Sequence, residues 1–214
     1  MSARPQEPIR LYRHALSGHC HRVQLLLELM HLPYQLIEIN LQQGEHKTPA
    51  FLQLNPFGLL PVIEDNGTVV ADSGAILVYL ARKYGGQRYL PEAPEALAAV
   101  QRWLAVAAGP LASGPAAARI AVLFGKPVDT ERVNRIAYDL LDVMEGWLST
   151  HRFLAADHET LADLAFYAYI AHAPEGNVAL DAYPQVRAWL TRIEQLPDFV
   201  PMQRSAAGLV VAED

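Results

Sequence analysis

The spacing of apolar and polar residues divides the chain into two parts. Over residues 8–86, strand-like and helix-like segments alternate. Ile9–Tyr12 alternates apolar with polar positions, as a strand does, and apolar residues recur at helical spacing from Val23 to Met30. Further strands are predicted at 34–39, 61–64 and 68–71, and further helices at 48–54 and 73–84. The order predicts a mixed four-stranded sheet covered by helices, an α/β fold.

Strand signals disappear after about Ala93, and the rest of the chain has helical spacing. Gly109-Pro110 and Gly114-Pro115 predict breaks, because glycine and proline interrupt helices. Thr160 followed by Asp163 is a capping-box variant that opens a very apolar helix. The expected organisation is an α/β domain over 8–86, a linker near 87–93 and an all-helical C-terminal domain over 93–206.

Composition narrows the class of protein. The chain has 214 residues, of which 51% are hydrophobic, and a net charge of −6, which argues against nucleic-acid or anionic-membrane partners. Met1–Pro8 lacks the apolar core of a secretory signal, and no uninterrupted apolar run is long enough to span a bilayer. The single cysteine, Cys20, excludes an internal disulfide. We therefore expect a cytoplasmic protein.

The turn between the first strand and the first helix carries a hydroxyl and a thiol. Ser17 and Cys20 lie where a helix begins, and the free N–H groups of a helix start attract negative charge. Ser17 is either a plain N-cap or the donor of a hydrogen bond to a bound thiolate. Cys20 is either a nucleophile or, as is more common, a small packed side chain, and without a second cysteine it has no dithiol chemistry.

Four histidines near this turn raise the question of a metal site, namely His14, His19, His21 and His31. His19 and His21 are two residues apart, so they diverge on a helix, and none of the four forms an i, i+4 pair. We expect no metal and read these histidines as surface or substrate-pocket residues.

Three further positions could bind parts of a peptide-like ligand. At Leu60-Pro61, a cis bond would turn the Leu60 backbone groups outward for pairing with an extended ligand. Asp72 could hold an ammonium group, while Ser73 at a helix start holds a carboxylate or merely caps the helix. His46 is available for a second carboxylate. A thiol, an amino-acid end, a peptide bond and a second carboxylate together describe glutathione.

The run Leu54–Val62, followed by Asp72–Ile76, resembles the N-terminal signature of cytosolic glutathione S-transferases with a serine- or cysteine-type site, the bacterial ones included. Thr160–Asp163 and the segment from Tyr183 to Arg192 resemble motifs of that family's helical domain. The resemblance covers residues 9 to about 203. It implies a thioredoxin-like first domain with cis Pro61, a helical second domain and a homodimer.

The resemblance also implies roles for individual residues. Ser17 falls at the catalytic position, and the glutathione-binding positions are Ser17, His46, Leu60, Asp72 and Ser73. Leu59 replaces a Gln or Lys that many relatives carry, which predicts weaker glutathione affinity. Tyr12 is an alternative activating hydroxyl. The predicted walls of the electrophile pocket are Tyr12, Leu16, Phe57 and Trp103.

The predicted function is conjugation of the glutathione thiolate to small electrophiles, with glutathione as co-substrate and no further cofactor. One alternative is a glutathione-dependent isomerase of the maleylacetoacetate type. Another is a non-catalytic binding protein with a transferase-like fold, against which the intact set of ligand positions argues.

Overall fold

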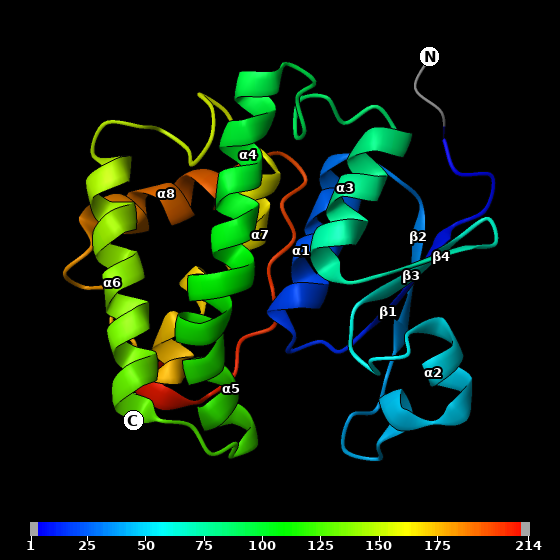
Figure 1. Cartoon of the computed structure of the whole chain (residues 1–214), viewed down its shortest axis with the longest axis horizontal. Coiled ribbons are helices and arrows are strands. Elements are labelled where there is room, and N and C mark those ends of the chain that lie inside the picture. The colour runs from blue at the N-terminus through cyan, green and yellow to red at the C-terminus, as the bar shows by residue number, and fades with distance from the viewer. Residues whose placement is uncertain (1–3, 211–214) are drawn as a thin grey trace. The chain divides into compact units, whose positions relative to one another are not determined.

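The computed structural model describes residues 4–210, which form two compact units (Figure 1). The first comprises the chain up to Leu90 together with Pro197–Met202, and the second comprises Pro91–Leu196 and the chain from Gln203 onward. The sequence prediction had placed 197–202 in the helical domain. This short segment lies instead with the first unit, where His21 Nε2 donates to the Val200 carbonyl at 2.8 Å.

A four-stranded mixed sheet forms the centre of the first unit, as predicted. Its strands are β1 (Ile9–Arg13), β2 (Tyr34–Glu38), β3 (Val62–Asp65) and β4 (Thr68–Ala71), in the order β2-β1-β3-β4. β1 pairs parallel with β2 and antiparallel with β3, and β3 pairs antiparallel with β4. Asn66 and Gly67 both have positive φ, 47° and 81°, which allows the tight β3–β4 hairpin.

Helices cover both faces of this sheet. The helices are α1 (Gly18–Leu29), α2 (Pro49–Leu54), which follows the 3₁₀ turn Glu45–Lys47, and α3 (Ser73–Lys83). α1 and α3 pack together on one face, where Leu11 and its register partner Ile63 are fully buried. α2 lies on the other face (Figure 1). There Tyr12 packs against Phe51 of α2. The alternation of β1 thus sends successive side chains into two separate cores.

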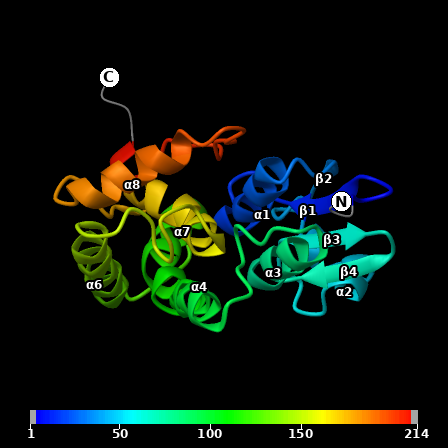
Figure 2. The same ribbon diagram turned by 90° about the horizontal axis from the view of Figure 1, so that it is seen from above.

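The second unit is helical, as predicted. Its helices are α4 (Pro94–Val106), the π-helical segment Ala107–Ala116, α5 (Ala117–Phe124), α6 (Thr130–Leu148), α7 (Leu161–Ala171) and α8 (Pro184–Glu194), with 3₁₀ turns at Ala173–Gly176 and Gly208–Val210. α7 packs against α4 and α8 and is buried from Leu161 to Ile170 (Figure 2). α7 is therefore the core helix of this unit.

The predicted breaks at Gly109-Pro110 and Gly114-Pro115 are wrong. The chain continues through both as wide π-helical turns, so that Pro94–Phe124 is one helix of 31 residues. A proline lacks the N–H of a regular turn and its ring crowds the preceding turn, and a widened turn accommodates both effects. This is the one described helix that could cross a membrane by length and composition, a test that core helices also pass. It packs against α6 and α7, and 39% of its most apolar window is buried within the described structure.

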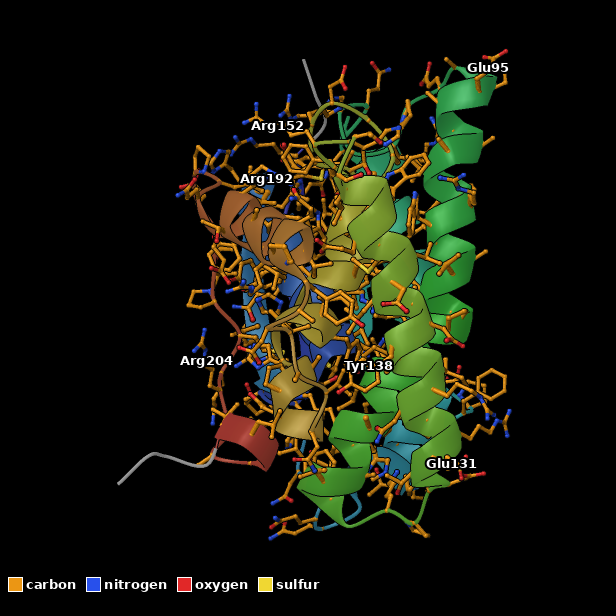
Figure 3. The ribbon with its side chains drawn as sticks, turned by 90° about the vertical axis from the view of Figure 1, so that its left-hand side faces the viewer. Glu95, Glu131, Tyr138, Arg152, Arg192 and Arg204 are labelled. Carbon is orange, nitrogen blue, oxygen red and sulfur yellow. The ribbon has the colours of Figure 1, made fainter. Side chains whose placement is uncertain are left out.

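Two sequence motifs of the second unit are fixed by side-chain hydrogen bonds. Thr160 and Asp163 form the predicted capping box, and the buried Asp163 carboxylate also accepts from Trp189 Nε1 at 2.9 Å. Arg192 on α8 donates from Nε to the Arg152 carbonyl at 3.1 Å (Figure 3). The end of α8 is thereby tied to the loop that precedes α7.

Candidate active site

Ser17 is the N-cap of α1, as the sequence predicted. Its backbone is extended, with φ −90° and ψ 115°, and its Oγ accepts from the Cys20 N–H at 3.3 Å. Accepting this bond uses an oxygen lone pair and leaves the hydroxyl hydrogen for another partner. A donor is thus held beside the positive end of α1.

Cys20, the second candidate at this turn, is buried on α1. Burial raises the pKa of its thiol to about 11, and the lowering effects of Ser17 and the His14 backbone do not offset it. The thiol is therefore protonated at neutral pH and is a poor nucleophile. The geometry favours the packed-residue reading of Cys20 and leaves Ser17 as the better candidate for thiolate chemistry.

Tyr12 lies in the core rather than at an open surface. Its ring meets Phe51 edge-on at 6.3 Å, and its hydroxyl donates to Glu64 at 3.1 Å. Burial and the hydrogen bond to Glu64 raise the pKa of this phenol. Tyr12 is on the sheet face covered by α2, whereas Ser17 begins α1 on the opposite face. Leu60 packs against the same cluster as Tyr12, whose hydroxyl is already bonded to Glu64.

The peptide bond between Leu60 and Pro61 is cis, as the family resemblance implied. Side chains hold the loop that precedes it. Asn55 Nδ2 donates to the Leu59 carbonyl at 2.9 Å, and Lys47 Nζ donates to the Phe57 carbonyl at 3.0 Å. The backbone of Leu60 is thus placed by groups from α2 and the 3₁₀ turn before it.

Gly58 brings the turn that carries His46 against this loop. Gly58 has φ 58°, and a Cβ built there would lie 2.7 Å from the His46 carbonyl oxygen, closer than real contacts allow. Only glycine fits both the backbone angle and the close approach. The structure therefore brings His46 and the Phe57–Leu60 loop side by side.

Asp72, and not Ser73, is the N-cap of α3, which corrects the simple reading of Ser73. Asp72 Oδ1 accepts from Gly74 N at 2.8 Å, and Asp72 has φ 73°. A positive φ at a residue other than glycine costs on the order of 1–3 kcal/mol and is concentrated at functional sites. The Asp72 carboxylate is exposed beside the start of α3.

Ser73 is buried and hydrogen-bonded to α1 instead of to its own helix. Arg22 Nη1 donates to Ser73 Oγ at 3.3 Å, and His19 Nδ1 lies 3.3 Å from the same oxygen. Sequence reasoning missed the role of Arg22. The available signal was a charged residue directly before the apolar residues Val23, Leu26 and Leu27 of α1.

The other predicted pocket residues have diverse surroundings. Leu16 is half-buried and Phe57 is 77% exposed, both in the first unit. Trp103 belongs to the second unit and is 3% exposed, with its ring edge-on to Phe166 at 5.4 Å. Burial in that aromatic cluster makes Trp103 a core residue, so its assignment as a pocket wall is replaced by the packing role.

The histidines near the first turn have separate contacts. His14 Nδ1 accepts from Leu16 N at 3.3 Å, and His31 Nε2 lies 3.6 Å from Asp198. Within residues 4–210 no group of three or more His, Cys, Asp or Glu side chains is arranged to hold a metal ion.

Known proteins match both units. The family model described as "Glutathione S-transferase, N-terminal domain" matches residues 16–83, and the one described as "Glutathione S-transferase, C-terminal domain" matches residues 75–197. Glutathione S-transferase 3 of Zea mays is 35% identical over 215 residues, which is 94% of this chain and 95% of the relative.

Solved structures agree with these matches. A glutathione S-transferase from Pseudomonas fluorescens Pf-5 has a TM-score of 0.86 at 34% identity, covering 92% of this chain and 100% of that one. A glutathione transferase homologue from Drosophila mojavensis with bound glutathione has a TM-score of 0.82 at 28% identity, covering 89% of both chains. The thioredoxin-like sheet and the helical second unit are those of one enzyme family, and this chain belongs to the glutathione S-transferase family.

Proposed function

We propose that this glutathione transferase stabilises the thiolate of bound glutathione with the Ser17 hydroxyl and adds it to small electrophiles. The observation that carries the proposal is the pair of residues at the start of α1. Ser17 has a hydroxyl hydrogen to donate beside the helix N-terminus, whereas the neighbouring Cys20 thiol is buried and protonated. One hydrogen bond and the helix dipole are together worth about 1–3 kcal/mol, or roughly one to two pKa units on the glutathione thiol.

The rest of glutathione would lie along the loop and the helix start described above. The exposed Asp72 carboxylate supports a role in holding the ammonium group, and Ser73 at the start of α3 supports a role in holding the adjoining carboxylate. Leu60 would pair with the peptide through its backbone, and His46 would lie near the glycyl end. Leu59 is apolar and exposed, which fits the expected weaker contact there.

Assembly and location are part of the proposal. Leu59 is 61% exposed, an apolar side chain on the first unit that a second copy of the chain would contact. We infer a cytoplasmic homodimer with a glutathione-binding domain over 8–86, joined by the segment 197–202, and a helical domain over 93–196 and 203–206. Leu16 and Phe57 remain the proposed electrophile contacts in the first unit.

The test is the pKa of the thiol of bound glutathione, read from the ultraviolet absorbance of the thiolate as pH is varied. We expect the wild-type protein to lower this pKa by roughly one to two units and the Ser17→Ala variant to lose most of the shift. The same lowering in Ser17→Ala would contradict the role of Ser17. Turnover of an isomerase substrate without net conjugation would favour the alternative reaction, and binding without any turnover would favour the non-catalytic reading.

A further inference from the structure

The Ser73 hydroxyl has two neighbours on α1 that compete for its hydrogen-bonding capacity. A hydroxyl has one hydrogen to donate and two lone pairs that accept. Arg22 Nη1 lies 3.3 Å from Ser73 Oγ and can only donate, so it occupies one lone pair. His19 Nδ1, also 3.3 Å away, can either donate or accept, depending on which ring nitrogen carries the hydrogen.

The charge state of His19 limits its ring to two neutral tautomers, which differ in whether Nδ1 donates or accepts. Burial, and to a lesser extent the nearby Arg22 cation, lower the pKa of His19 to about 3. At neutral pH the ring is therefore uncharged and carries a single hydrogen. If that hydrogen is on Nε2, Nδ1 accepts and takes up the Ser73 hydroxyl hydrogen. If it is on Nδ1, His19 donates and the Ser73 hydrogen is left for a third partner.

Only the second arrangement is compatible with a carboxylate at Ser73. A carboxylate is acceptor-only, so a hydroxyl whose hydrogen is already used would present a lone pair to it. With Arg22 and His19 both donating, the two lone pairs of Ser73 are filled and its hydrogen must be donated elsewhere. The positive end of the α3 dipole favours an anion in the same place, although Asp72 already takes the Gly74 N–H.

We propose that His19 is a positioning residue: its Nδ1–H donates to Ser73 Oγ and thereby frees the Ser73 hydroxyl hydrogen for the α-carboxylate of the γ-glutamyl group. The proposal rests on the proposed role of Ser73 in glutathione binding. It assigns glutathione recognition to a residue of α1 that does not contact the ligand. It predicts an effect on affinity and none on the chemical step.

The experiment compares His19→Leu with His19→Asn, because Asn keeps an N–H donor near the position of Nδ1 and Leu does not. We expect His19→Leu to raise the dissociation constant of glutathione about three- to tenfold, with kcat at saturating glutathione unchanged. His19→Asn should stay within about twofold of wild type. His31→Asn is the matched control, since it removes an exposed imidazole of the same unit at a positive-φ position that Asn tolerates.

A ligand that lacks the α-carboxylate separates this role from general structural damage. With 4-aminobutanoyl-cysteinylglycine, which keeps the amine and the thiol, His19→Leu should bind as well as wild type. Equal weakening for both ligands, or a lower kcat with unchanged affinity, would overturn the proposal. If His19→Leu does not fold, nitrogen NMR of the wild-type protein decides, because Nδ1 must carry the hydrogen in the glutathione complex.

One further variant distinguishes failure of this inference from failure of the proposed role of Ser73 in glutathione binding. A Ser73→Ala variant with unchanged glutathione affinity would refute the proposed role of Ser73 itself. Weaker binding in Ser73→Ala together with wild-type binding in His19→Leu would refute only the role of His19.

Discussion

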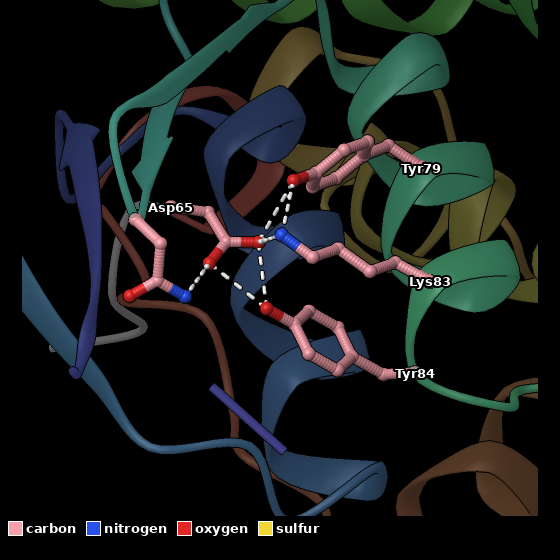
Figure 4. Close-up of polar contacts among 5 residues, drawn as sticks. Asp65, Tyr79, Lys83 and Tyr84 are labelled. Carbon is pink, nitrogen blue, oxygen red and sulfur yellow. Dashed lines mark hydrogen bonds and ion pairs between the residues drawn. The ribbon is translucent and has the colours of Figure 1, made fainter. Parts of the chain in front are cut away.

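Lys83 at the end of α3 forms an ion pair with Asp65 at the end of β3, with Nζ 2.8 Å from Oδ2, and the Asp65 side chain is fully buried (Figure 4). The hydroxyls of Tyr79 and Tyr84 donate to the same oxygen at 2.9 and 2.7 Å. The carboxylate of a sheet residue thus accepts hydrogen bonds from three side chains at the end of α3. It fastens the end of α3 to the sheet, on the face where α3 packs against α1, the helix that Ser17 caps.

Replacing Asp65 tests how much this attachment stabilises the fold. Asp65→Asn leaves Lys83 without a charge partner and replaces a carboxylate that accepts from four side chains, those of Asn66, Tyr79, Lys83 and Tyr84, by an amide. We expect the free energy of unfolding to fall by about 2–3 kcal/mol, less than for a fully buried pair because Lys83 is partly exposed. Urea denaturation measures it. The double variant Asp65→Asn/Lys83→Met should recover part of the loss, and a single variant as stable as wild type would contradict the assignment.

The same carboxylate predicts a pH dependence of stability. Burial raises the pKa of Asp65, but hydrogen bonds from Lys83, Tyr84 and Tyr79 outweigh it and hold the pKa below its ordinary value. Because the folded pKa lies below the unfolded one, this stabilisation is complete above about pH 4 and is lost as pH falls through the folded pKa. Below about pH 4, wild type should lose stability more steeply with falling pH than Asp65→Asn. Equal slopes would be inconsistent with a depressed pKa.

Kinetics should separate the two residues at the start of α1. Ser17→Ala removes the proposed donor to the thiolate and should lower the conjugation rate about ten- to a thousandfold, with a much smaller change in glutathione affinity. Cys20→Ala should keep most activity, because the buried thiol is protonated. Steady-state rates with a chromogenic electrophile measure both. Loss of turnover in Cys20→Ala with retained turnover in Ser17→Ala would reverse the assignment.

Asp72 should contribute both to the stability of the fold and to glutathione binding. Asp72→Ala removes the N-cap of α3, so the free energy of unfolding should fall by about 1 kcal/mol. It should also weaken glutathione binding by about 1.5–3 kcal/mol, since a charge-assisted bond to the ammonium group is lost. Calorimetry measures the binding, and unchanged affinity would refute the ammonium role. The capping loss should be absent in Asp72→Asn, because Asn is also a good N-cap.

Two glycines of the π-helical segment offer a matched pair. A Cβ at Gly114 would lie 2.8 Å from the backbone nitrogen of Ala137 on α6, whereas a Cβ at Gly109 would meet no atom within 4 Å. Gly114→Ala should therefore lower the melting temperature, with a cost of about 1–3 kcal/mol. Gly109→Ala should be neutral or stabilise by about 0.5–1 kcal/mol, because alanine favours helix. Equal effects would show that α6 does not approach the helix at Gly114.

Much of the fold follows from short stretches of sequence. β1 alternates over five residues and Asn66-Gly67 supplies two positive-φ positions, so strand and hairpin are local properties. The cap at Ser17 and the capping box at Thr160 are equally local, because each bonds a backbone N–H within three residues. The motif around Pro61 was sufficient for the family and for the cis bond.

Tertiary structure decided the side-chain contacts between residues that lie far apart in the chain. Ser73 is the clearest case: a local reading makes it a helix cap, but Arg22 and His19, more than fifty positions earlier, bind its hydroxyl once α1 and α3 pack together. Likewise, the Tyr12 hydroxyl donates a hydrogen bond to Glu64 because β1 and β3 are neighbours in the sheet.

In the second unit, too, tertiary packing overrides a local sequence signal. Glycine and proline at 109–115 carry a local signal for a break, yet the packing of the long helix against α6 and α7 stabilises a continuous helix with widened turns. Propensities of this kind amount to about 1–3 kcal/mol per residue, and the burial of a helix face across several turns exceeds them. Sequence by itself therefore determined most of the elements and the family of this protein. Long-range packing decided the continuity of the long helix and which polar groups meet at the site.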